Sequence, residues 1–164
     1  MVRGKDIMTT KVITVLPDTP IVEAAKLLIE KHFNGLPVVD EEGRLTGIIC
    51  QDDLIFQQKK IPIPSFFTVL DGLIPLSSEK SIEKEIKKIA AVTVASAMTP
   101  DPITVAPEAG VEDIASLMIK YDIHSLPVLN QGKLVGIIGK EDILKTLLPE
   151  SHISFQHPND ADDA

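Results

Sequence analysis

Aromatic residues are scarce in this sequence: among its 164 residues there are no tryptophans, one tyrosine and five phenylalanines. Hydrophobic residues still reach 44%, so the core of the folded chain must consist mainly of valine, isoleucine, leucine and alanine side chains. A single cysteine, Cys50, excludes an internal disulfide. Because small secreted domains commonly depend on disulfides, the lone thiol favours a cytosolic setting.

Long apolar runs and an excess of basic residues are also missing. No stretch approaches the roughly 20 apolar residues that a membrane-spanning helix needs, and no secretory leader precedes the first patterned segment. Acidic residues outnumber basic ones by 24 to 16, which gives a net charge of −8. A nucleic-acid binder needs a basic face to hold phosphates. We therefore expect a cytoplasmic protein that spans no membrane and binds no nucleic acid.

The sequence does contain one stretch that occurs twice. The first copy runs from Asp6 to about Phe56 and the second from Ser96 to about Leu147, at an offset of about 90 residues. The matched positions are Met8 with Met98, Ile13-Thr14-Val15 with Ile103-Thr104-Val105, Pro17 with Pro107, Leu36-Pro37-Val38 with Leu126-Pro127-Val128, Gly47-Ile48-Ile49 with Gly136-Ile137-Ile138, and Asp53 with Asp142. Two similar units packed as one body are expected.

Each copy predicts the order strand, helix, strand, strand, helix, which is an α/β (α+β) unit. In the first copy the β-branched run 12–15 predicts a strand. Apolar residues at helical spacing predict a helix that starts at Pro20, is capped by Thr19 and ends near Lys31. Two short apolar runs joined by a glycine-containing turn, 36–40 and 44–49, predict a hairpin. Another helix follows from residue 51.

The second copy repeats this order, with its first helix beginning at Glu108 or Ala109. The chain then divides into repeat one at 1–57, an insert at 58–95, repeat two at 96–149 and an acidic, disordered tail at 150–164. The insert contains an apolar segment and a helix. It either covers the hydrophobic flank of the two units or forms a dimerisation or partner surface, centred on Phe66, Phe67, Leu70 and Leu73.

Both copies place an aspartate at a turn from strand to helix, Asp53 in the first and Asp142 in the second. The start of a helix offers free N–H groups and a partial positive charge, which suit an anion. A carboxylate at this point can accept hydrogen bonds from both hydroxyls of a ribose, at about 1.5–3 kcal/mol each. The plainer alternative is that the helix dipole alone favours an acidic residue in the first turn.

The Met-Thr-x-x-x-Ile-Thr-Val-x-Pro opening, the Leu-Pro-Val strand and the Gly-Ile-Ile-x-x-x-Asp ending, each present twice, resemble a pair of CBS domains, named for cystathionine β-synthase. The resemblance covers all of the chain except the insert and the tail. It implies two β-α-β-β-α units packed sheet to sheet about a pseudo-two-fold axis, with helices outside. It also implies a regulatory module that binds adenosine-containing ligands in clefts between the repeats and forms a homodimer.

In the family the clefts are crossed, so the resemblance places Ile13 and Phe33 opposite Asp142, and Ile103 and Ile123 opposite Asp53. The full set of candidate ligand-binding residues is Asp142, Gly139, Lys140, Ile137, Ile13, Lys11, Phe33, Asn34, His124, Ser125, Asp53, Cys50, Ile48, Ile103, Ile123 and Gly35. Core packing is the plainer role for Phe33 and Ile123, and a lone surface histidine is the plainer role for His124.

This sequence departs from the family where a Ser or Thr hydroxyl normally precedes the aspartate. Cys50 and Gly139 stand there instead, although Gly139 permits a close backbone approach and Lys140 beside it can neutralise a phosphate. His124 occupies a position where the family often has a basic phosphate contact, whereas Asn34 lacks that charge. We therefore expect the cleft of Asp142, flanked by Lys11, to be the better formed, and the cleft of Asp53 and Cys50 to be less complete.

The sequence shows no catalytic triad, no phosphate-binding Gly-Lys-Ser/Thr loop and no histidine–carboxylate metal cluster, so we expect neither an enzyme nor a metal site. The preferred interpretation is a regulatory module that senses AMP, ADP, ATP or S-adenosylmethionine and requires no cofactor. The alternative is a structural dimerisation module whose clefts stay empty. No fused enzyme, channel or transporter identifies the regulated protein.

Overall fold

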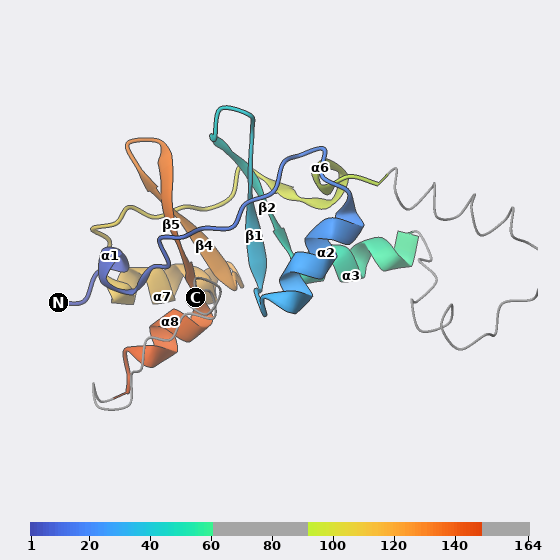
Figure 1. The fold of residues 1–164 in the computed structure, drawn as a ribbon. Coiled ribbons are helices and arrows are strands. Elements are labelled where there is room, and N and C mark those ends of the chain that lie inside the picture. The colour runs from blue at the N-terminus through green and yellow to red at the C-terminus, as the bar shows by residue number, and fades with distance from the viewer. Residues whose placement is uncertain (61–91, 149–164) are drawn as a thin grey trace, which may run out of the picture.

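The computed structural model describes residues 1–60 and 92–148. Figure 1 shows two halves side by side, each built of a β-hairpin and flanking helices. The first half contains α2 (Ile21–Glu30), β1 (Gly35–Val39), β2 (Leu45–Cys50) and α3 (Gln51–Lys60); the second contains α7 (Val111–Lys120), β4 (Ser125–Asn130), β5 (Lys133–Gly139) and α8 (Lys140–Lys145).

The predicted fold class is confirmed. Residues 61–91 of the insert, with the surface expected around Phe66, Phe67, Leu70 and Leu73, and the tail from residue 150 lie outside the described residues. Within the described part, no helix is long and apolar enough to cross a bilayer.

The long helices form where the sequence places apolar residues on one face. In α2 the buried residues are Ile21, Ala24 and Leu28, at helical spacing. The predicted start was wrong by one residue, because Pro20 is the N-cap and the Thr19 Oγ1 instead accepts a hydrogen bond from the Leu16 N–H at 3.0 Å. Likewise α7 begins after Gly110 rather than at residue 108 or 109.

The strand predicted at 12–15 is absent as a strand. Val15 alone forms a parallel bridge, to Val38 of β1, in which its N–H donates to the Pro37 carbonyl at 3.1 Å. β-Branched residues favour extended backbone, but a strand also needs a neighbouring chain along its length. Only the last residue of this run reaches β1. The preceding residues, 11–13, pair with no described strand and line a cavity.

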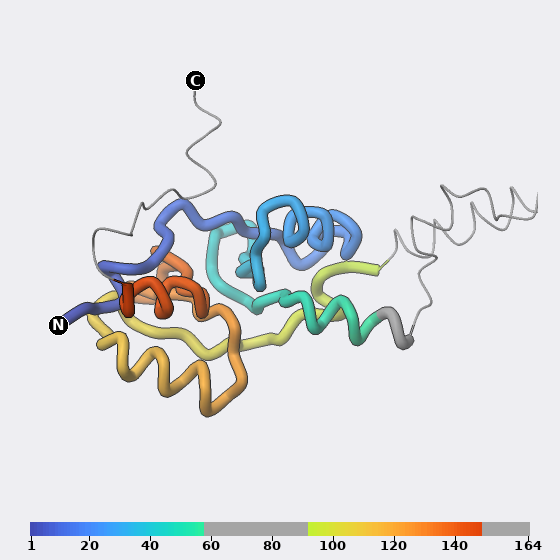
Figure 2. Tube along the Cα trace, turned by 90° about the horizontal axis from the view of Figure 1, so that it is seen from below, coloured from blue at the N-terminus to red at the C-terminus, as the bar shows by residue number. Residues whose placement is uncertain are grey.

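Two short helices that the sequence did not predict hold the halves together. The segment before the first repeat forms α1 (Gly4–Ile7), which lies against the second half, where the Gly4 N–H donates to the Ala109 carbonyl at 2.8 Å. The segment before the second repeat forms α6 (Val94–Ala97), which lies against the first half through a 2.8 Å bond from the Ala95 N–H to the Pro17 carbonyl. Figure 2 shows these leading segments passing between the halves in opposite directions.

The same exchange continues into the sheets. Thr9 and Ile137 of β5 exchange two backbone hydrogen bonds, at 2.9 and 3.0 Å. The matching segment of the other repeat, β3 (Thr99–Pro100), pairs antiparallel with β2. The sheets therefore have the orders β1-β2-β3 and β4-β5. In each repeat the first residues pair with the hairpin of the other repeat.

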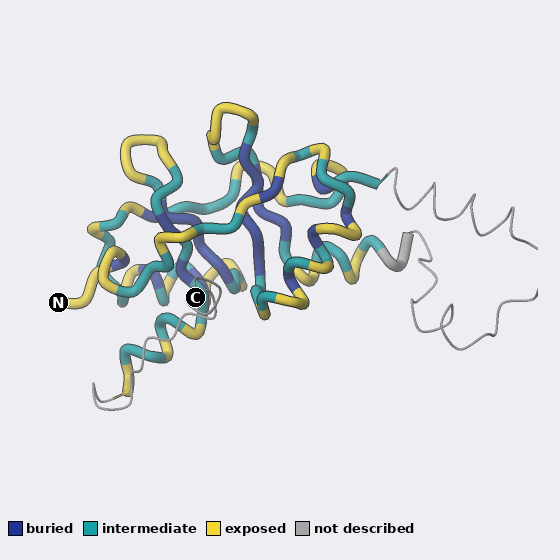
Figure 3. Tube along the Cα trace, in the orientation of Figure 1, coloured by how far each residue is buried: buried dark blue, intermediate teal, exposed yellow. Residues whose placement is uncertain are grey.

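Each half has its own aliphatic core, drawn in dark blue along the strands in Figure 3. Val94 of α6 is fully buried in the core of the first half, and Ile7 and Met8 pack against the core of the second half. Burying one such side chain contributes about 1.5–3 kcal/mol. Separating the halves would expose these residues, so the exchange fixes the arrangement on which the cavities between the halves depend.

Candidate functional site

Within residues 1–60 and 92–148, two cavities lie between the halves, each at a turn from strand to helix. The Asp142 cavity has a volume of about 180 Å³ and is lined by Thr9, Lys11, Val12, Ile13, Lys31, His32, Phe33, Asn34, Gly35, Ser125, Ile137, Gly139, Glu141, Asp142 and Lys145. The Asp53 cavity has about 430 Å³ and is lined by Asn34, Ile48, Cys50, Gln51, Asp52, Asp53, Thr99, Asp101, Pro102, Ile103, Tyr121, Asp122, Ile123, His124 and Ser125. Both halves contribute to both cavities.

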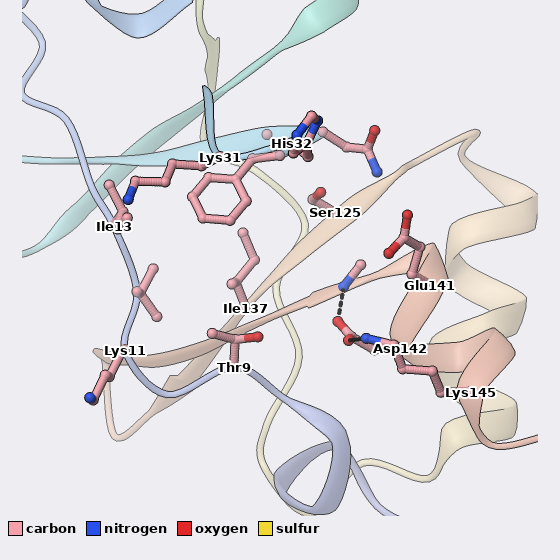
Figure 4. A pocket seen from close by; sticks show the side chains of 15 residues that line it. Thr9, Lys11, Ile13, Lys31, His32, Ser125, Ile137, Glu141, Asp142 and Lys145 are labelled. Carbon is pink, nitrogen blue, oxygen red and sulfur yellow. Dashed lines mark hydrogen bonds and ion pairs between the residues drawn. The ribbon is translucent and has the colours of Figure 1, made fainter. Parts of the chain in front are cut away.

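The crossed leading segments explain why residues distant in sequence share a wall. Thr9 is bonded to Ile137, so the chain from Lys11 to Ile13 passes over the end of β5. Figure 4 shows the result: Ile13 and Lys31 border one side of the Asp142 cavity, and Glu141 and Asp142 border the other. The arrangement offers an apolar wall facing a pair of carboxylates.

Asp142 is fixed in orientation by its own turn. Its Oδ2 accepts a hydrogen bond of 2.8 Å from the Gly139 N–H, and the Lys145 Nζ lies 3.7 Å from its Oδ1. The carboxyl side chain is only 15% exposed. One oxygen is thus held by the backbone, which turns the second oxygen toward the lysine. A carboxylate held in this way presents a preset acceptor to a bound molecule.

Asp53 is held in the same manner by the matching turn, where the Cys50 N–H donates to its Oδ2 at 2.8 Å. Its electrostatic surroundings differ. Burial, and to a lesser extent the charge of Asp52, raise the pKa of the Asp53 carboxyl above its usual value, although the Cys50 N–H acts in the opposite direction. The charged form of Asp53 is therefore disfavoured compared with a carboxylate in water.

The Cys50 thiol faces the same surroundings. Burial, followed by the charges of Asp53 and Asp52, raises the pKa of Cys50 to about 12. The thiolate is the reactive form of cysteine, so native Cys50 should react with iodoacetamide at pH 8 roughly a thousandfold more slowly than an ordinary thiol, as the rise from 9.0 to about 12 implies. Mass spectrometry of the alkylated protein checks this, with the urea-unfolded chain as the control. Equal rates in the two states would contradict the assignment.

The structure brings together most of the residues singled out from the sequence. The Asp142 cavity holds Lys11, Ile13, Phe33, Gly35, Ile137 and Gly139 beside Asp142; the Asp53 cavity holds Ile48, Cys50, Ile103 and Ile123 beside Asp53; Asn34 and Ser125 line both. Ile13 and Phe33 of the first repeat line the cavity of Asp142, and Ile103 and Ile123 of the second repeat line the cavity of Asp53, so the side chains are paired crosswise.

Two basic residues lie elsewhere than expected relative to the Asp142 cavity. His124 lines the Asp53 cavity and not the Asp142 cavity, where its ring was expected beside a phosphate. Lys140 lines neither cavity. Lys140 is the first residue of α8, and residues two apart on a helix point about 200° apart, so its side chain diverges from that of Asp142.

Other basic residues take their place. Lys31 and His32 follow the end of α2, and Lys145 lies on α8 one turn after Asp142. The spacing of three between Asp142 and Lys145 was visible in the sequence and places both on one helix face. His32 was not predictable, because it adopts a positive φ of 54° that directs the chain out of the helix and into the cavity wall.

No group of three or more histidine, cysteine, aspartate or glutamate side chains in the described part of the chain is placed to hold an ion. A cofactor would instead have to fit a slot with apolar walls, one fixed carboxylate and lysines at the rim. These are the features of a site for a small organic molecule.

Two homologous halves that exchange their leading segments and enclose cavities between them define a tandem-repeat binding module. A family model described as the CBS domain matches residues 5–60 and 94–149, which is more than half of the chain. The chain belongs to the CBS-domain family, and the resemblance noted from its motifs is confirmed. A relative in Bacillus subtilis, the CBS domain-containing protein YhcV, is 31% identical over 139 residues, which cover 85% of this chain and 81% of that protein.

Solved structures give the same result. The crystal structure of CBSX2 in complex with AMP has a TM-score of 0.67 and 27% identity, and the match covers 90% of this chain and 96% of that one. The CBS domain pair of protein MJ0100, in complex with 5′-methylthioadenosine and S-adenosyl-L-methionine, has a TM-score of 0.64 and 30% identity, again over 90% and 96%. The architecture of this chain is that of a CBS-domain pair.

Proposed function

We propose that this protein is a regulatory module that senses an adenosine-containing ligand, with the Asp142 cavity as the primary site and AMP as the first candidate. The observation that carries the proposal is that the fixed Asp142 carboxylate of the second half lies in one cavity with Ile13 and Phe33 of the first half. A ribose would donate its hydroxyls to Asp142 while an adenine ring lies against the apolar side chains. The cavity has about 180 Å³, so the phosphate would extend to its rim, where the lysines lie.

The backbone supports recognition of the base. Neither the N–H nor the carbonyl of Ile13 bonds to another described residue, so both are available to the edge of an adenine. Ser125 is only 5% exposed, and its hydroxyl likewise has no partner in the described part of the chain. Buried polar groups normally find a hydrogen-bond partner. A ligand in the cavity supplies one.

Relatives support the chemical class. CBSX2 was crystallised with AMP and the MJ0100 pair with two adenosyl compounds, and both have the fold of this chain. Because each cavity has walls from both halves, a bound ligand would favour one relative orientation of the halves. A partner protein that binds one orientation of the halves more tightly than the other would then respond to the ligand. We propose regulation of this kind, and not catalysis, as the activity of the chain.

We further propose that two copies associate. Ile55 of α3 and Leu144 of α8 occupy matched positions in the repeats and are 63% and 60% exposed. Apolar residues repeated about a pseudo-two-fold axis suit a symmetric partner surface, and two-fold dimers are the commonest oligomers. Light scattering of the intact chain would then give twice the mass of one chain, and a monomer mass would refute the association.

A thermal-shift panel tests the function directly. With AMP, ADP, ATP or S-adenosylmethionine at 100 times the dissociation constant, binding should add about 2.7 kcal/mol to the free energy of unfolding and raise Tm by roughly 5–10 °C. If none of them changes Tm at millimolar concentration, the sensor proposal fails and a structural dimerisation module remains. The missing hydroxyls at Cys50 and Gly139 are the observation that favours that second function.

Restoring one hydroxyl should tighten binding. Gly139→Ser adds a side chain whose Cβ would lie 3.6 Å from the Asp142 Oδ2 and 3.9 Å from the His124 carbonyl oxygen, which is ordinary contact, in extended backbone that any residue adopts. A new hydrogen bond to the ligand contributes about 0.5–1.5 kcal/mol. Calorimetry should show AMP affinity higher by roughly 3- to 10-fold, whereas the matched change Cys50→Ser should leave it unaltered. Weaker AMP binding by Gly139→Ser would contradict the placement of the phosphate.

A further inference from the structure

The two cavities share one backbone arrangement. Ile13 and Ile103 occupy matched positions, and the Asp142 and Asp53 carboxylates each accept a 2.8 Å bond from a backbone N–H three residues earlier. The backbone groups of Ile103, like those of Ile13, bond to no other described residue. A site for adenosine on one side therefore has an equivalent frame on the other.

The charges on this shared frame are reversed. Lys11 of the Asp142 cavity is matched by Asp101 of the Asp53 cavity, and His32 is matched by Asp122. Lys31 is matched by Tyr121, which removes a further positive charge. The described lining of the Asp142 cavity thus holds three lysines and two carboxylates.

The described lining of the Asp53 cavity, by contrast, holds four carboxylates, from Asp52, Asp53, Asp101 and Asp122, and no lysine or arginine. The one histidine there is His124, whose Nε2 lies 3.9 Å from the Asp122 Oδ1, so it is paired with one of the four carboxylates only. These carboxylates surround the cavity, with Asp122 at its rim and 94% exposed, so a phosphate bound there would lie among side chains of its own charge, which is unfavourable. A positively charged ligand would be stabilised by them.

A metal ion does not suit the same carboxylates. Among residues 1–60 and 92–148 no three acidic, histidine or cysteine side chains converge on one point, so the aspartates surround the cavity of about 430 Å³ without forming a coordination shell. A second feature points to an organic ligand. The buried Ser125 hydroxyl, 5% exposed and without a described partner, lines this cavity as well.

We infer that the two cavities select adenosine ligands of opposite charge: the Asp142 cavity takes an anionic, phosphate-bearing ligand, and the Asp53 cavity takes a cationic adenosine derivative such as a sulfonium nucleoside. The inference rests on the proposed function and assigns a second ligand class to the second cavity. The described linings of the two cavities overlap only at Asn34 and Ser125. Because the cavities are otherwise separate, we expect both ligands to bind at the same time.

The test measures binding of three probes to the intact chain by calorimetry: AMP, S-adenosylmethionine and its uncharged analogue 5′-methylthioadenosine. Saturation with AMP should leave the S-adenosylmethionine affinity within about twofold. The double variant Asp101→Asn/Asp122→Asn should weaken S-adenosylmethionine by roughly tenfold, with little change for 5′-methylthioadenosine. Asparagine suits both positions, because their φ values are +46° and +52° and asparagine tolerates left-handed backbone.

The matched control removes two carboxylates that line neither cavity, Asp18 and Glu41, both exposed. Asp18→Asn/Glu41→Gln should leave all three affinities unchanged. Competition between AMP and S-adenosylmethionine for one site, or equal weakening by the two double variants, would overturn the inference. Binding of AMP without S-adenosylmethionine would overturn it while leaving the proposed function intact. Binding of no probe at all would refute the proposed function as well.

Discussion

Asp142→Ala is expected to weaken AMP binding by about 100-fold or more. The carboxylate is held by the Gly139 N–H and by the nearby Lys145 ammonium, so it reaches the ligand in a fixed position. Two hydrogen bonds from ribose hydroxyls to a charged acceptor contribute about 1.5–3 kcal/mol each, and each 1.4 kcal/mol corresponds to a tenfold change in affinity. Isothermal titration calorimetry with AMP measures the loss.

The repeat provides a matched control. Asp53→Ala removes the same kind of bond, from the Cys50 N–H at 2.8 Å, so any general cost of losing this contact is common to the two variants. Its cavity lacks lysines among the described lining residues, so AMP affinity should fall by less than about threefold. Equal losses in the two variants, or a larger loss in Asp53→Ala, would show that the Asp53 cavity is the AMP site.

Gly136→Ala should destabilise the protein by about 1–3 kcal/mol, the usual cost of overfilling a packed site. Gly136 is buried in β5, and a Cβ placed on it would lie 2.5 Å from the Met8 Sδ, 2.9 Å from the Cγ and 3.1 Å from the Cβ. The Met8 Cβ cannot rotate away from its own backbone. The added methyl group therefore pushes the leading segment off β5, and both Tm and AMP affinity should fall, as thermal unfolding and calorimetry would show.

Two variants separate this effect from a general intolerance of alanine. Gly110→Ala places a Cβ no closer than 3.7 Å to any of the neighbours considered, so it lacks the clash, and its Tm should fall by less than that of Gly136→Ala, through the weaker N-cap of α7 alone. In the double variant Gly136→Ala/Met8→Ala, the loss of the Sδ and Cγ should make the total destabilisation smaller than the sum of the two single changes. A Gly136→Ala protein that melts like the parent would contradict the packing of the crossed segments.

Local features of the fold could be predicted from the sequence, whereas the exchange between repeats could not. Helical spacing in α2 and α7 and the glycine turns of the hairpins are properties of neighbouring residues. The crossing depends on contacts more than 100 residues apart, such as Gly4 with Ala109. The short helices α1 and α6 have four residues each, which is too short to show a helical period.

The site could be predicted to a similar extent. The repeated aspartates and the resemblance to a family suggested Asp142, Ile13 and Phe33, and the structure places all three around one cavity. The sequence did not reveal which basic residues join them, because Lys31 and His32 arrive there through the way α2 ends. The reversal of charge between the cavities was visible at Lys11 and Asp101, but it acquires meaning only once both residues are located in matched walls.

The most direct test of the central claim is a crystal structure of the chain with AMP bound. We expect electron density for AMP in the Asp142 cavity, with both ribose hydroxyls within about 3 Å of the Asp142 carboxylate and the adenine against Ile13. Density for AMP in the Asp53 cavity, or on the outer surface of the helices, would contradict it.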